Sequence, residues 1–169
     1  MNDKIFNAKA KHAFEGLASY NSGYEVGVTD TIECINKLYK EVYNHLEPGW
    51  KTAFGKDLMF ELLESIYEDG CLDSFQVTEV KEKYGQLDID IFDCGKSTDN
   101  VLEKYKELSK YICAFCGEPA RYISKGWVYP ICQNCIELID GKYEPIEEVY
   151  NLDSYNTVLS NIDNIKNNM

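Results

Sequence analysis

Residues 113–135 read CAFCGEPARYISKGWVYPICQNC, with a C-x-x-C pair at each end. Fifteen residues separate the two inner cysteines. Two residues between cysteines let one tight turn point both sulfurs inward, and two such turns facing each other supply the corners of a tetrahedron. This spacing is typical of four-cysteine zinc sites. It predicts a structural Zn²⁺, with iron in the same cage as the alternative, held by Cys113, Cys116, Cys132 and Cys135.

Four thiolates leave such a metal no open coordination position, so we expect it to hold a ribbon together rather than to activate water. Gly117 directly follows the first pair, where a residue that tolerates positive φ helps to close the turn. A thioredoxin-like redox site needs one C-x-x-C at a helix start, not two facing pairs. The polar start of the chain shows no signal peptide, which favours the cytoplasm and disfavours disulfides.

The other cysteines and the histidines stand alone in the sequence. Cys34, Cys71 and Cys94 are expected to be small buried residues or inert thiols. A nucleophilic cysteine needs a histidine partner, and His12 and His45 lie in no motif. We therefore predict no catalytic residue and a chain that is not an enzyme.

Upstream of the ribbon, apolar spacing predicts helices and one hairpin. Asp30 is expected to cap the first helix, which continues to Leu46 and ends at Pro48-Gly49. Tyr84-Gly85 is expected to join two strands, the second of which alternates cleanly. Leu87, Ile89 and Ile91 should be buried, with Asp88 and Asp90 in solvent. The other predicted spans are a helix over 56–68, strands over 75–83 and 86–92, and a helix over 98–110.

The ends of the chain give weaker patterns. Tyr24, Val26 and Val28 alternate as an edge strand would. Apolar residues at near-helical spacing predict a C-terminal tail containing Val149, Leu152, Tyr155, Leu159 and Ile162. Together the patterns predict an α+β fold in which helices pack on a small antiparallel hairpin or sheet, with a C-terminal zinc-ribbon module. The predicted divisions are an acidic helix and hairpin domain over 1–110, the ribbon over 111–142 and the helical tail over 143–169.

The chain of 169 residues carries 29 acidic and 17 basic side chains, a net charge of -12. Between Glu47 and Asp93 there are 12 acidic and 4 basic residues, a local net of 4 - 12 = -8. The ribbon from Tyr111 to Lys142 has three of each and is neutral. Such a surface repels phosphate, so direct nucleic-acid binding and docking on anionic lipid are not expected. No stretch approaches the roughly 20 apolar residues of a membrane-spanning helix.

Four short motifs occur in order along the chain: Gly49 to Gly55, Val80 to Leu87, Cys113 to Ala120 and Gly126 to Pro130. Together they resemble a set of small, largely uncharacterised bacteriophage and prophage proteins. Those proteins place a Lys-x-Lys-[Tyr/Phe]-Gly-x-Leu hairpin ahead of a four-cysteine ribbon. The resemblance covers residues 46–136 and implies a phage or mobile-element origin without a known activity. Such proteins are basic or aromatic after the hairpin leucine, where this chain has Asp88 and Asp90.

These observations favour a non-catalytic binding protein that uses its acidic face on a protein partner with a basic surface, as an inhibitor of a host nucleic-acid-handling or defence enzyme would (anti-CRISPR-like). The candidate contact residues are Glu61, Glu64, Glu68, Asp88, Asp90 and Trp127. Trp50 and Trp127 are each expected to cover the small core beside the metal, whereas an exposed Trp127 would be a contact hot spot.

Three alternatives remain open at this stage. In the first, the chain is an accessory or regulatory protein that binds nucleic acid through its zinc ribbon. In the second, paired carboxylates such as Glu61/Glu64 or Asp88/Asp90 bind Mg²⁺ in an enzyme. In the third, the acidic surface only keeps the protein soluble.

Overall fold

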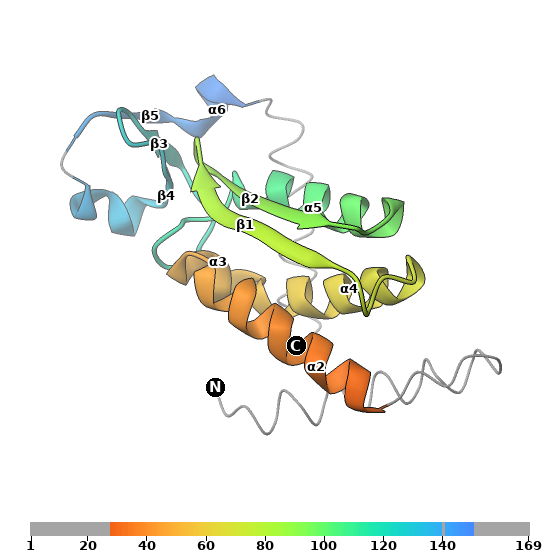
Figure 1. Cartoon of the computed structure of the whole chain (residues 1–169). Coiled ribbons are helices and arrows are strands. Elements are labelled where there is room, and N and C mark those ends of the chain that lie inside the picture. The colour runs from red at the N-terminus through yellow and green to blue at the C-terminus, as the bar shows by residue number, and fades with distance from the viewer. Residues whose placement is uncertain (1–27, 140, 151–169) are drawn as a thin grey trace.

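The computed structural model of the chain describes residues 28–139 and 141–150, in which helices pack on a two-stranded hairpin and a second small sheet follows (Figure 1). The mixed α+β class predicted from the sequence is confirmed, and the four-cysteine cluster lies on the C-terminal side of it. No helix in the described ranges has the length and apolar character needed to cross a membrane.

The helical layer contains α2 (Val28–Glu41), the 3-10 turn η1 (Tyr43–His45), α3 (Pro48–Ala53) and α4 (Gly55–Glu68). The prediction of one helix ending at Pro48-Gly49 was wrong, because α2 ends at Glu41 and Pro48 begins α3 instead. Proline suits this first helical position because its missing N–H would have no partner there. The helix predicted over 56–68 is confirmed as α4, and Gly70 follows its end with a φ of 69°.

Strands β1 (Gln76–Lys83) and β2 (Gln86–Phe92) form the predicted antiparallel hairpin, with Val80 opposite Ile89. Tyr84 and Gly85 both have positive φ, at 55° and 82°, which matches a two-residue turn of type I′. Leu87 and Ile89 are buried as predicted, and Ile91 packs partly against the same core.

Helix α5 (Lys96–Ser109) runs along β2 and beside α4 (Figure 1). Its last residue meets the strand directly, because the Leu87 N–H donates to Ser109 Oγ over 2.7 Å. Asp88 was predicted to lie in solvent, and that prediction was wrong. Lys106 of α5 and Lys83 of β1 each approach its carboxylate to 3.3 Å, and the side chain is only 14% exposed. Asp90 is exposed as predicted.

The carboxylate of Asp69, just after α4, tethers the start of α5. It accepts hydrogen bonds from the N–H groups of Gly95, Ser97 and Thr98 and from the Thr98 hydroxyl, at 2.7 to 3.1 Å. These bonds satisfy N–H groups that have no partner inside the helix. The end of α4 and the beginning of α5 are therefore held together by one side chain.

A disulfide joins Cys71 to Cys94, close to the same place. The prediction that these two cysteines are isolated was wrong, and so was the expectation that disulfides are disfavoured. They are 23 residues apart in sequence, and only the packing of α4 against α5 and the hairpin brings their Cα atoms to 5.6 Å. Cys34 is buried in the core, as expected.

Most of the core lies between the hairpin and the helices α2, α4 and α5. Its largest fully buried side chains include Trp50, Phe75 and Tyr105. Val101, Leu102 and Leu108 of α5 also pack on this cluster, as their spacing predicts.

The C-terminal module has a three-stranded antiparallel sheet in the order β4-β3-β5. Its strands are β3 (Tyr122–Ser124), β4 (Pro130–Ile131) and β5 (Tyr143–Pro145), with the 3-10 helix η2 (Gln133–Leu138) after β4 and α6 (Ile146–Val149) at the end. Val28 lies in α2, so the edge strand predicted there was wrong at that residue. The predictions for His12, Tyr24, Val26, Leu152, Tyr155, Leu159 and Ile162 lie outside the described residues.

Candidate metal centre and contact surface

Two backbone turns present the four predicted metal ligands. In the first, the Gly117 N–H donates to the Cys113 carbonyl over 3.0 Å, and Gly117 has a φ of 85°. Positive φ at this position favours glycine, as the sequence predicts. In the second, the Cys135 N–H donates to the Cys132 carbonyl over 3.1 Å at the start of η2. The two turns lie close together in space, although the chain segment that carries β3 and β4 separates them in sequence.

The geometry of the four sulfurs fits a tetrahedral metal ion. The ligand atoms of Cys113, Cys116, Cys132 and Cys135 all lie within 4.8 Å of one another. Cys116 Sγ and Cys132 Sγ are 3.5 Å apart. Metal–sulfur bonds of about 2.3 Å in a tetrahedron place the sulfurs roughly 3.8 Å apart, so the cluster needs only small adjustments around an ion. The residues present therefore fit a four-thiolate metal site.

The thiols of this cluster affect one another's ionisation. Burial raises the pKa of Cys135, and hydrogen bonds with Cys116 and Cys132 raise it further. Burial also raises the pKa of Cys116. At Cys132 burial acts in the same direction, but hydrogen bonds from neighbouring thiols and from the N–H groups of Cys135 and Asn134 outweigh it and lower the pKa. Four thiolates crowded together need a compensating cation, which a bound metal ion supplies.

Helix α3 anchors the first cysteine turn to the main core. The Gly49 N–H donates to the Ala114 carbonyl over 2.7 Å, and the Trp50 indole N–H donates to the Ile112 carbonyl over 3.2 Å. Trp50 is fully buried. The structural role predicted for Trp50 beside the metal site is therefore confirmed.

Two cysteine turns that flank strands β3 and β4 in sequence are consistent with a metal-binding ribbon module. No family model, curated protein or solved structure matches the chain.

The acidic residues singled out from the sequence divide into two groups. Glu61 accepts hydrogen bonds from Lys104 at 2.6 Å and from the Tyr105 hydroxyl at 2.9 Å, so it helps to join α4 to α5. Asp88, between its two lysines, also has a structural role. The others are exposed and make no ion pair with any residue that the structure describes: Glu64, Glu68 and Asp90.

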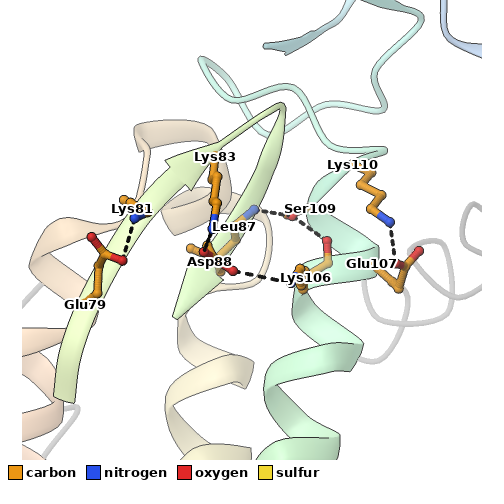
Figure 2. Close-up of polar contacts among 9 residues, drawn as sticks. All are labelled: Glu79, Lys81, Lys83, Leu87, Asp88, Lys106, Glu107, Ser109 and Lys110. Carbon is orange, nitrogen blue, oxygen red and sulfur yellow. Dashed lines mark hydrogen bonds and ion pairs between the residues drawn. The ribbon is translucent and has the colours of Figure 1, made fainter. Parts of the chain in front are cut away.

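Lysines gather where the hairpin meets the end of α5, but each has an acidic neighbour (Figure 2). Lys81 pairs with Glu79, Lys110 pairs with Glu107, and Lys83 and Lys106 share Asp88. Four lysines therefore share three carboxylates, which leaves this cluster a net charge of only +1. The arrangement gives no support to a basic hairpin that binds nucleic acid.

Trp127 was predicted to cover the core, and that prediction was wrong, because the side chain is 76% exposed. Gly126, with a φ of 95°, places it in a turn at the tip of the ribbon, where the indole N–H donates to the Tyr129 hydroxyl over 3.1 Å. Exposed indoles of this kind are frequent hot spots in protein interfaces. The exposure therefore agrees with the alternative prediction, a contact role for an exposed Trp127.

The tip of the β1–β2 hairpin lies against the same turn of the ribbon. A Cβ added to Gly85 would lie 3.0 Å from Cγ1 of Val128, the residue after Trp127. Tyr84, beside Gly85, is 75% exposed. Sequence reasoning did not select Tyr84 as a contact residue, although its place in a two-residue turn already implied exposure.

Proposed function

We propose that this chain is a non-catalytic zinc-ribbon protein that works by binding a protein partner with a basic surface. The all-cysteine ligand set supports zinc, since such sites are typical of structural zinc and close the coordination sphere. The lack of an open position supports a structural role for the metal. Within the described ranges, His45 is exposed and belongs to no nucleophile–base pair, which supports a role without catalysis.

One observation carries the contact proposal most directly. Glu64, Glu68 and Asp90 are exposed and unpaired within the described part of the chain, whereas the clustered lysines of the hairpin are all paired. The free charge of the helix and hairpin region is therefore negative, in agreement with its local net of -8. Complementary charge speeds association with a basic partner and disfavours wrong partners.

The partner that this negative charge fits best is a host enzyme that holds nucleic acid in a basic groove, including RNA-guided defence enzymes. An acidic protein competes with phosphate for such a groove. The motif order that resembles phage and prophage proteins supports a phage or mobile-element origin. The proposed role is then an inhibitor that acts in the host cytoplasm.

Charge reversal tests the proposal. Protein carrying Glu64→Lys, Glu68→Lys and Asp90→Lys is compared with wild type in a pull-down from bacterial lysate, followed by association kinetics on the captured protein at several salt concentrations. Glu61 and Asp88 are left unchanged because both make structural contacts. A matched control reverses three other exposed carboxylates, Glu137, Glu147 and Glu148.

We expect the first variant to associate at least tenfold more slowly at low salt, with the difference shrinking as salt screens the charges. The control should associate as wild type does. Capture of the same partner at an unchanged rate by the first variant would mean that the acidic surface serves solubility alone.

A further inference from the structure

The outer edge of β2 has no strand beside it. The sheet has only two strands, so β1 pairs with one edge of β2 and leaves the other edge open. The Leu87 N–H points to this open edge, because it donates to Ser109 Oγ of α5. Residues two apart in a strand direct their N–H and C=O groups to the same side. The backbone groups of Ile89 and Ile91 therefore face the open edge as well.

Helix α5 runs beside this edge and hydrogen-bonds to it at one end. Around Leu87 the helix is in contact with the strand through Ser109 (Figure 2). Farther along, a groove of about 310 Å³ lies between β2 and α5, and its helical side is lined by Asp99, Leu102, Glu103 and Lys106. No side chain in the described ranges hydrogen-bonds to the N–H of Ile89 or Ile91. The volume lies at the lower end of ligand pockets, roughly 300–1,000 Å³.

The groove combines an apolar strip with an acidic rim. Leu102 of α5 and Ile91 of β2 contribute apolar surface, and both are half-buried. Asp90, Asp99 and Glu103 line the same groove, are exposed and make no ion pair with any described residue. The ammonium group that also lines it, on Lys106, is bound to Asp88. The charge of the groove lining that no ion pair compensates is therefore negative.

We propose that this groove binds an extended basic peptide segment of the protein partner, added as a strand to the edge of β2. The backbone of the peptide pairs with Ile89 and Ile91. Its side chains alternate, with apolar residues on Leu102 and Lys or Arg beside Asp90, Asp99 and Glu103. This inference rests on the proposed function and specifies how the basic partner is held.

The test uses the full chain and a synthetic peptide of alternating Lys and Val. A second peptide of the same sequence carries N-methyl groups at the positions that face β2, which keeps the charge and removes the backbone donors. Binding is measured by fluorescence anisotropy, and amide hydrogen exchange is followed residue by residue. We expect the N-methylated peptide to bind at least tenfold more weakly. The amides of Ile89 and Ile91 should exchange at least tenfold more slowly with the first peptide, while that of Leu87, already bonded, should change little.

A variant with Asp99→Asn and Glu103→Gln should weaken peptide binding at least fivefold, and a control with Glu147→Gln and Glu148→Gln should not. Equal binding of both peptides, no binding of either, or unchanged exchange at Ile89 and Ile91 would overturn the proposal. The proposal would also be overturned if the protein formed a dimer that the groove variant dissociates. In that case a second copy of the chain would occupy the edge of β2. If the groove variant captures the lysate partner normally while reversal of Glu64 and Glu68 abolishes capture, the groove proposal fails and the proposed function stands.

Discussion

Gly49 and Gly117 lie so close together that neither position has room for a side chain. A Cβ on Gly49 would lie 2.7 Å from the nitrogen of Gly117, and a Cβ on Gly117 would lie 2.7 Å from the carbonyl oxygen of Gly49. Both neighbours are backbone atoms and cannot rotate away. The start of α3 is therefore packed against the first cysteine turn through main-chain contact.

Gly49→Ala should destabilise the protein strongly. A Cβ there would also lie 2.0 Å from the Cys113 carbonyl oxygen, so the helix or the cysteine turn must shift. Overpacking of this kind costs about 1–3 kcal/mol and occasionally more. Urea unfolding measures the loss, with Gly141→Ala as a control because its nearest neighbouring atom is 3.9 Å away. Equal midpoints for the two variants would show that the contact is looser than described.

Removal of the metal should be visible at Trp50. The chain has two tryptophans, so a Trp127→Phe variant reports on Trp50 alone. Its indole donates to Ile112, directly before the first ligand cysteine. Chelation should loosen this turn and shift the Trp50 emission to longer wavelength, and added Zn²⁺ should restore it. Cys116→Ser should give the shifted spectrum without chelator. Unchanged emission from protein shown by elemental analysis to be metal-free would contradict the coupling.

Ile89→Ala should cost about 2–5 kcal/mol of stability, because the side chain is buried in the core beneath the hairpin. Phe92→Ala in the same strand is the matched control, since that side chain is 66% exposed. Surface changes of this kind usually stay within about 0.5 kcal/mol. Thermal unfolding of both variants distinguishes them, and a larger loss for Phe92→Ala than for Ile89→Ala would mean that the register of β2 is wrong by one residue.

Asp69→Asn should destabilise the protein at neutral pH by about 1 kcal/mol, the usual value of a helix cap. Burial by itself would raise the pKa of Asp69, but hydrogen bonds from Thr98, Ser97 and Gly95 outweigh it and hold the pKa below its usual 3.8. A lowered folded-state pKa means that the stabilisation is present above about pH 4 and is lost as the pH falls further. The difference between wild type and variant should therefore shrink towards pH 3. Asp73→Asn, at an exposed site nearby, is the control and should leave the stability at neutral pH within about 0.5 kcal/mol of wild type.

The parts of the fold that follow from local pattern were predictable. Alternation along residues 87–91 and the Tyr84-Gly85 turn defined the hairpin, and the C-x-x-C spacing defined the metal ligands. The errors concern residues whose surroundings come from distant segments. Asp88 acquires Lys106 only after α5 packs beside β2. Likewise, the exposure of Trp127 depends on how the ribbon turn sits against the hairpin tip, which residue spacing does not encode.

The disulfide-bonded pair and the four clustered ribbon cysteines place opposite chemical demands on the maturation of this protein. Forming the Cys71–Cys94 bond requires an oxidant that removes two electrons, whereas the four ribbon cysteines must remain reduced to bind a metal. An oxidant that meets the chain before the metal does would find seven thiols, including the four of the ribbon. A metal ion bound first withdraws four of them from this chemistry. Metal loading ahead of oxidation would therefore protect the ribbon cysteines, and preparations oxidised first should contain mispaired molecules.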